Sequence, residues 1–135
     1  MLPARILIIE DEIVLAKNMK TYFSYVSGGT SDVRTAADAA QALEILESFK
    51  PDALVLDYLL PDIDGLKLYA EITRRQARKI NCVMITGNPS EQLTLDSRDL
   101  GIHQIIRKPF RFSDLQLRLE AFKPAPGGSV PDANV

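Results

Sequence analysis

Short runs of β-forming residues alternate along the chain with segments in which apolar residues follow helical spacing. The runs cover residues 5–10, 32–37, 53–57, 81–86 and 104–108. The segments between and after them carry apolar residues three or four positions apart, the spacing of an amphipathic helix. Strands that alternate with helices predict an α/β fold in which helices cover both faces of a parallel sheet.

Four of the expected helices show a clear apolar stripe. The stripes are Leu15, Met19, Tyr22 and Val26; Ala36, Ala40, Leu43 and Leu46; Leu68, Tyr69 and Ile72; and Phe112, Leu115, Leu119 and Phe122. Ser113 and Gln116 predict a capping box for the last helix. Asn88 and Pro89 predict the N-cap and first turn of the fourth helix. That helix has few apolar residues, so we expect it to be the least firmly packed.

The runs differ in polarity, and this difference predicts their place in the sheet. The first, third and fourth runs are almost continuously apolar, as expected for central strands buried on both faces. The second run is more polar and should lie at an edge. We expect residues 1–123 to form one domain. Residues 124–135 hold three prolines and two glycines, which predicts a flexible tail or the start of a linker.

Composition narrows the functional classes. The chain has 135 residues, of which 46% are hydrophobic and 25% charged, as in soluble single-domain proteins. Its net charge of −2 provides no general attraction to nucleic acid. The single cysteine, Cys82, excludes an intrachain disulfide, and the single histidine, His103, lacks partners for a zinc site. No stretch suits a membrane span and no signal-peptide pattern is present, which favours the cytoplasm.

Polar residues gather where the predicted strands end. Glu10, Asp11 and Glu12 follow the first strand, Asp57 ends the third, Thr86 ends the fourth and Lys108 ends the fifth. In an open parallel sheet all these strand ends lie on one edge, where ligands bind at the point of reversed winding. These residues are therefore expected to converge, although they are far apart in the sequence.

The expected cluster suits phosphoryl chemistry. Crowded carboxylates need a cation, and an all-oxygen set suits Mg²⁺. Lys108 supplies a positive charge for an anion and Thr86 a hydroxyl donor. Asp57 beside a metal and a lysine can attack phosphorus and form an aspartyl phosphate. Each residue also has a purely structural interpretation, as a turn aspartate, a helix cap, a strand end or a solvated lysine.

Four motifs carry a resemblance to a known family. They are "ILIIEDE", "LVLDYLLPDIDG", "MITG" and "RKPF". In this order and spacing, the chain from Arg5 to Phe122 resembles the receiver domain of two-component response regulators. The resemblance implies a flavodoxin-like (βα)5 three-layer sandwich with a parallel five-stranded sheet in the order 2-1-3-4-5.

The resemblance also implies a role for each residue of the cluster. It makes Asp57 the phosphoryl acceptor and Glu10 and Asp11 the acidic pair for Mg²⁺. Asp57 and the backbone carbonyl of Leu59 would be further metal ligands. Thr86 and Lys108 match the hydroxyl and the lysine that engage the phosphoryl oxygens.

The family resemblance implies partners as well. The phosphoryl donor would be a sensor histidine kinase or a histidine phosphotransfer protein. The output would pass through the face of the fourth helix, fifth strand and fifth helix to a downstream effector or a tethered output domain, or through a homodimer. The protein would signal, catalysing only its own phosphorylation and autodephosphorylation. No direct contact of this chain with nucleic acid or membrane is expected.

Two positions depart from the usual family pattern. Ile105 stands three positions before Lys108, where many members have an aromatic residue that turns inward on activation. Isoleucine is stiff at χ1 and has no hydroxyl, so we expect a smaller side-chain switch. Glu10 replaces the more common aspartate, and its longer side chain can still hold the metal through water.

Other classes are weaker interpretations. A phosphatase of the haloacid-dehalogenase type needs a second acid two positions after its nucleophile, and this chain has Leu59 there. A dinucleotide-binding domain lacks its glycine-rich motif. A pseudo-receiver without phosphorylation is disfavoured because the acids and Lys108 are all present. The sequence leaves open whether the chain acts alone or belongs to a longer regulator.

Overall fold

The computed structural model describes residues 1–123, so the tail predicted at 124–135 lies outside the described residues. Within residues 1–123, five strands form one parallel sheet in the order β2-β1-β3-β4-β5. The strands are β1 (Arg5–Ile9), β2 (Asp32–Ala36), β3 (Ala53–Asp57), β4 (Asn81–Thr86) and β5 (Gln104–Arg107). The helices are α1 (Ile13–Val26), α2 (Ala39–Ile45), α3 (Gly65–Gln76), α4 (Glu91–Leu100) and α5 (Phe112–Glu120). The predicted fold and strand order are confirmed.

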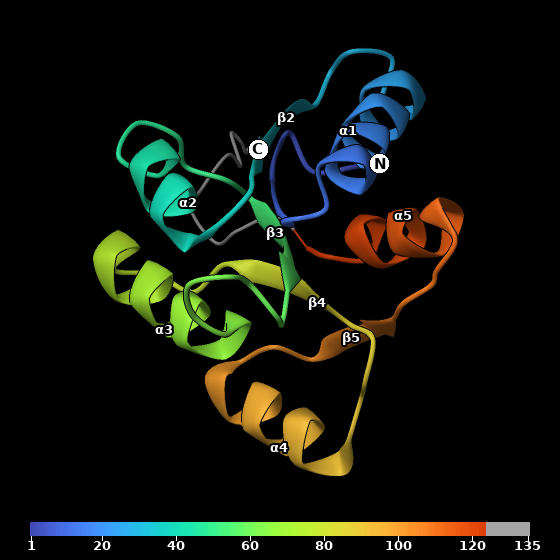
Figure 1. Cartoon of the computed structure of the whole chain (residues 1–135). Helices are drawn as coiled ribbons and strands as arrows, with labels where there is room; N and C mark the ends of the chain where they lie inside the picture. Colours follow the sequence, from blue (N-terminus) through green and yellow to red (C-terminus); the bar gives the residue numbers. More distant parts are fainter. Residues whose placement is uncertain (124–135) are drawn as a thin grey trace.

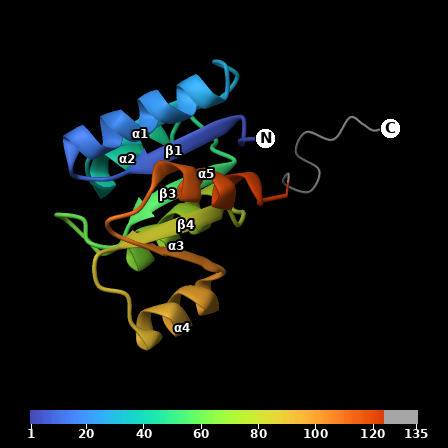
Figure 2. The same cartoon turned by 90° about the vertical axis from the view of Figure 1, so that its right-hand side faces the viewer.

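The helices cover both faces of the sheet. Figure 1 shows α1 and α5 on one side of the strands, and α2, α3 and α4 on the other. In the turned view of Figure 2, α1 lies above the strands and α4 below them. Between successive strands a helix carries the chain back to the end of the sheet where the strands begin, so all strands point the same way. Their carboxyl ends therefore lie together.

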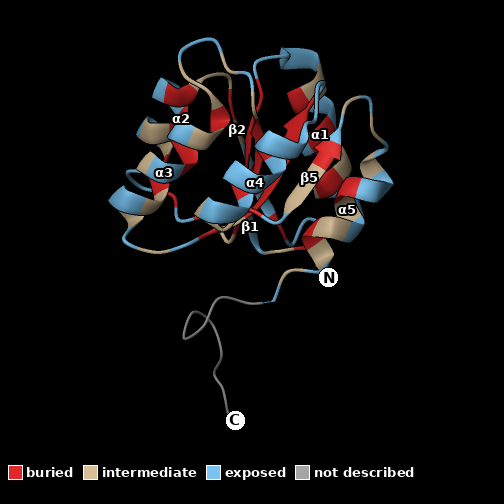
Figure 3. Cartoon of the chain, turned by 90° about the horizontal axis from the view of Figure 1, so that it is seen from below, coloured by how far each residue is buried: buried red, intermediate tan, exposed pale blue. Residues whose placement is uncertain are grey.

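Side chains of the central strands alternate between two cores. On β3, Leu54 and Leu56 pack with α2 and α3, whereas Ala53 and Val55 pack with α1 and α5. Every residue of β3 is buried, while β2 at the edge has the exposed residues Asp32 and Arg34 and the buried residues Val33 and Ala36. Figure 3 shows the buried strands between helices with exposed outer faces. Burial on both faces explains the continuous apolar runs of the central strands.

The buried face of α1 differs from the predicted stripe. Ala16, Met19 and Phe23 are buried, whereas Tyr22 is half-buried and Val26 is exposed. The reason is that α1 packs against α5 as well as against the sheet. The Tyr22 ring meets Phe112 of α5 edge to face, and its hydroxyl donates a 2.6 Å hydrogen bond to Gln116 Oε1.

The second helix also begins later than its predicted stripe. Ala36 is the last residue of β2, and α2 buries Ala39 and Ala42 in place of Ala40. The cause is a helix cap, because the Asp38 carboxylate accepts a 2.8 Å hydrogen bond from the Gln41 amide. Such a cap satisfies an amide that has no partner within the helix.

Two predicted caps are wrong. Ser90, and not Asn88, caps α4 by accepting a hydrogen bond from the Leu93 amide. The backbone amide of Asn88 instead donates to the Thr86 hydroxyl, which keeps Asn88 close to the end of β4. Ser113 lies inside α5, whose N-cap position is held by Arg111 without a side-chain cap.

The fourth helix has little buried apolar surface. Leu93 and Ser97 are its buried residues, and the Leu95 side chain is exposed. Ser97 is polar, and the only other apolar contribution of α4 to the core comes from the half-buried Leu100. This observation agrees with the loose packing expected from the sequence of this segment.

Candidate functional site

The polar residues singled out in the sequence meet at one edge of the sheet. Asp57 and Thr86 are the last residues of β3 and β4. Glu10 and Asp11 follow β1 directly, and Lys108 follows β5. Backbone hydrogen bonds between neighbouring strands continue one residue beyond the ends of β1 and β5. Glu10 N donates to Ala36 O at 2.9 Å, and Lys108 N donates to Thr86 O at 2.8 Å. The site residues are therefore held by the sheet itself.

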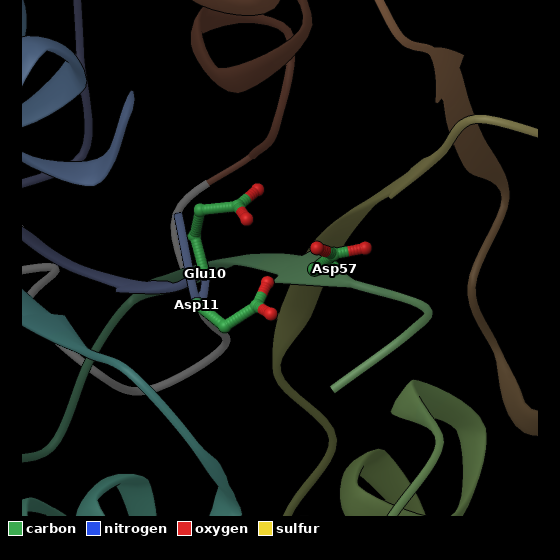
Figure 4. Close-up of side chains that lie close together, drawn as sticks. All are labelled: Glu10, Asp11 and Asp57. Carbon is green, nitrogen blue, oxygen red and sulfur yellow. The ribbon is translucent and has the colours of Figure 1, made fainter. Parts of the chain in front are cut away.

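Three carboxylates form an acidic cluster there. Glu10, Asp11 and Asp57 each offer an oxygen within 4.8 Å of the others. Figure 4 shows Asp11 and Asp57 turned toward a shared space, with Glu10 beside them. Glu10 and Asp57 are buried, whereas Asp11 is exposed. An oxygen-only set that is partly open to solvent fits a hard cation that keeps several waters, such as Mg²⁺.

Lys108 balances the charge of this cluster. Its Nζ lies 2.7 Å from Glu12 Oε2, 2.9 Å from Glu10 Oε1 and 3.1 Å from Asp57 Oδ2. Burial alone would lower the pKa of the ammonium, but the contacts with Glu12, Glu10 and Asp57 outweigh burial and raise this pKa above its ordinary value. Lys108 therefore stays charged.

Glu10 is the carboxylate most affected by burial. Burial raises the pKa of Glu10 to about 7, although Lys108 and the amide of Glu12 act in the opposite direction. That amide donates a 3.0 Å hydrogen bond to Glu10 Oε2. A buried carboxylate with such a pKa needs a positive charge beside it to stay ionised. Lys108 provides one such charge, and a bound metal ion would provide another.

The segment after β3 closes over Asp57. The Leu59 amide donates a 3.1 Å hydrogen bond to Asp57 Oδ1, and Leu59 pairs with Asp64 in an isolated bridge. The chain then returns so closely that a Cβ on Gly65 would lie 2.7 Å from Asp57 O and 3.0 Å from Tyr58 Cα. Position 65 therefore requires glycine, and α3 begins against the end of β3. The role of the Leu59 carbonyl as a metal ligand stays a prediction.

Thr86 ends β4 at the same edge of the sheet as Asp57. It is buried, and its Oγ1 accepts a 3.1 Å hydrogen bond from the Asn88 amide. The hydroxyl is thereby tied to the loop that leads into α4. A displacement of Thr86 would consequently also shift the backbone that leads into α4.

Two residues make contacts at or near the site that the sequence did not predict, although Glu12 was expected to lie at this edge of the sheet. Glu12 forms the 2.7 Å ion pair with Lys108, and its position directly after the acidic pair was the available signal. Asp62 accepts hydrogen bonds of 3.0 and 3.1 Å from the amides of Ala39 and Ala40. It thus ties the loop after Asp57 to the start of α2. No local pattern indicates this contact, because its partners are more than twenty residues away.

Comparisons with known proteins agree with this geometry. A family model described as the response regulator receiver domain matches residues 6–120. The response regulator MprA of Mycobacterium ulcerans is 31% identical over 117 residues, covering 87% of this chain and 49% of the relative. MprA of Mycolicibacterium vanbaalenii is 29% identical, covering 89% of this chain and 50% of the relative. The chain spans about half the length of these curated relatives.

Solved structures show the same fold. The non-phosphorylated HemR receiver domain from Leptospira biflexa superposes with a TM-score of 0.77 at 28% identity, covering 86% of this chain and 90% of that one. The chain belongs to the response regulator receiver domain family of two-component signalling systems. Among residues 1–123, no helix combines the length and the apolar character needed to cross a bilayer.

Proposed function

We propose that Asp57 accepts a phosphoryl group and that this modification switches the domain between two signalling states. The observation that carries the proposal is the convergence of Asp57 with two further carboxylates and a charged lysine at the carboxyl edge of the sheet. Asp57 Oδ2 faces Lys108 and Oδ1 accepts the Leu59 amide, so the carboxylate is held in one orientation. A carboxylate held in this way is suited to attack phosphorus.

The transfer step would involve one bond formed and one broken. An Asp57 oxygen forms an O–P bond while the P–N bond of a donor phosphohistidine breaks. The electron pair of the broken bond stays on the imidazole nitrogen, which becomes the leaving group. Lys108 would pair with one equatorial phosphoryl oxygen and the Thr86 hydroxyl would donate a hydrogen bond to another. Hydrolysis of the acyl phosphate would later return Asp57 to a carboxylate.

The acidic cluster would hold the divalent ion that this step needs. Glu10, Asp11 and Asp57, with the backbone carbonyl of Leu59, would bind Mg²⁺ directly or through water. When bound, the ion supplies positive charge for the phosphoryl oxygens. Asp11 is the exposed member of the cluster and is suited to direct ligation. Buried Glu10, which also contacts Lys108, is suited to a supporting position.

The family membership supports two partners, a phosphoryl donor and an output partner. The phosphoryl donor would be a sensor histidine kinase or a histidine phosphotransfer protein. The receiver would act on a downstream effector or on an output domain, since relatives such as MprA are about twice as long as this chain. The domain itself would turn over no external substrate. Its chemistry would be limited to its own phosphorylation and dephosphorylation.

The output surface would be formed by α4, β5 and α5. Leu95 of α4 and Leu117 of α5 are exposed there. A shallow groove of about 550 Å³ runs beside β5 and α5, lined by Arg107, Phe110 and Leu117 among others. Thr86 is linked to this surface through the Asn88 amide, which precedes α4. We propose that phosphorylation shifts the population of conformations at this face, which would engage an effector or a second copy.

The first test is the intact mass of the protein after incubation with Mg²⁺ and a small acyl phosphate. We expect a gain of one phosphoryl group that disappears in Asp57→Asn and when Mg²⁺ is chelated. Amide chemical shifts recorded with beryllofluoride should change on α4, β5 and α5 as well as around Asp57. Absence of the mass gain, with Mg²⁺ binding confirmed, would contradict phosphorylation. Shift changes confined to the Asp57 pocket would contradict the output surface.

A further inference from the structure

The ammonium of Lys108 is surrounded by three carboxylates. Lys108 Nζ donates hydrogen bonds of 2.7 Å to Glu12 Oε2 and 3.1 Å to Asp57 Oδ2, and Glu10 Oε1 lies 2.9 Å away as a third ion-pair partner. The proposed function requires Lys108 to contact a phosphoryl oxygen. Under that function, a phosphoryl oxygen that approaches Lys108 competes with the carboxylates that the ammonium already contacts.

The three carboxylates differ in how easily they can leave. The Glu10 and Asp57 side chains are 0% and 6% exposed, whereas the Glu12 side chain is 62% exposed. Moving Glu10 off Lys108 would leave a buried charge without its partner, which is costly. Asp57 stays in place as the acceptor, and on phosphorylation its negative charge passes to the phosphoryl oxygens, which take over its contact with Lys108. Glu12 can turn into water at little cost, because its carboxylate is already largely solvated.

The position of Glu12 in the fold agrees with such a displacement. Glu12 holds the N-cap position of α1, yet its side chain makes no hydrogen bond to the first amides of the helix. It reaches across to Lys108 instead. Once released, the carboxylate would stay near the N-terminus of α1, where the helix dipole favours a negative charge. Glu12 also stands outside the cluster of Glu10, Asp11 and Asp57, so its movement would leave the candidate metal ligands in place.

We propose that Glu12 is a built-in competitor of the phosphoryl group for Lys108. In the unphosphorylated protein it neutralises the lysine, and on phosphorylation it gives way to a phosphoryl oxygen. Glu12 acts through Lys108 and is therefore a positioning residue. This inference rests on the proposed function, and it adds that the chain opposes its own phosphorylation through one exposed carboxylate.

The test compares Glu12→Gln and Glu12→Ala with the wild type. Glu47→Gln is the matched control, because it removes the same charge from an exposed residue beyond the C-terminal end of α2, at the opposite edge of the sheet. The probe is beryllofluoride with saturating Mg²⁺, titrated by calorimetry. We expect both Glu12 variants to bind roughly fivefold more tightly than the wild type, the scale of one partly solvated ion pair. Glu47→Gln should bind as the wild type does.

A second readout needs neither metal nor phosphoryl analogue. The Cε and Hε signals of Lys108 should shift in both Glu12 variants of the free protein and stay unchanged in Glu47→Gln. A merely structural role of Glu12 would weaken beryllofluoride binding, whereas competition strengthens it. Equal or weaker binding in the Glu12 variants, or an unchanged Lys108 signal, would overturn the inference while the wild type still binds. A wild type that fails to bind would overturn the proposed function and this inference with it.

Discussion

Substitution of Gly65 by alanine tests how closely the start of α3 is packed against the acceptor strand. The added Cβ would lie 2.7 Å from Asp57 O and 3.0 Å from Tyr58 Cα, and both are backbone atoms that no side-chain rotation can move away. Overpacking of this kind costs about 1–3 kcal/mol. Alanine regains only a few tenths of this through helix propensity, since position 65 is the first residue of α3.

We therefore expect Gly65→Ala to lower the free energy of unfolding by about 2 kcal/mol. For a domain of this size, that loss corresponds to a fall in Tm of roughly 6–10 °C. Urea unfolding followed by circular dichroism measures the free energy, and calorimetry measures the Tm. Because the clash involves the carbonyl of Asp57, the substitution should also slow phosphorylation from a small acyl phosphate.

The matched control is Gly87→Ala, in the loop after β4 at the same edge of the sheet. A Cβ at Gly87 meets no atom within 4 Å, and its φ lies outside the left-handed range. This variant should stay within about 0.5 kcal/mol of the wild type in stability. If Gly65→Ala were as stable as Gly87→Ala, the argument that close backbone approach requires glycine would be refuted.

Three further predictions concern residues around the site. Burial raises the pKa of Asp62, but the hydrogen bonds from the amides of Ala39 and Ala40 outweigh burial and hold this pKa below its ordinary value. The stabilisation by the Asp62 carboxylate is therefore present at neutral pH and is lost as the pH falls below about 4. Asp62→Asn should cost about 1 kcal/mol at pH 7 and less at pH 3 in urea unfolding; an equal loss at both pH values would contradict this. Ser97 is fully buried and its hydroxyl has no hydrogen-bond partner within residues 1–123, so Ser97→Ala should raise the free energy of unfolding by up to about 1 kcal/mol, and a lower urea midpoint would count against the reasoning. Ile105 should keep its rotamer between crystal structures with and without beryllofluoride; an inward flip would show that it switches as an aromatic residue does.

The sequence by itself determined the class of fold, the identity of the central strands and the edge at which the polar residues gather. Continuous apolar runs indicate strands buried on both faces, because only a sheet covered on both faces can bury every side chain of a strand. The residues at the ends of such strands must converge, since parallel strands share one carboxyl edge. Asp57, Thr86 and Lys108 were found in this way without any contact being known.

Helix faces and helix starts were predicted less well, and the reasons are physical. Successive residues of a helix are about 100° apart, so a stripe shifted by one position selects a different face. The sequence does not reveal that α1 also packs against α5, and this contact turns Tyr22 away from the sheet. Caps depend on which of several nearby polar side chains reaches a free amide. Ser90 reaches one, and Asn88 does not.

Only the tertiary structure decided which charges pair at the site. Lys108 and Glu12 are 96 positions apart, and the sequence indicates that they share an edge but not that they touch. Asp62 looks like an ordinary turn residue until the fold brings the start of α2 beside it. Ion pairs and hydrogen bonds act over about 3 Å, whereas patterns along the chain place residues only to within an element. The ion pair between Glu12 and Lys108, which accompanies that of Glu10, is therefore known only from the tertiary structure.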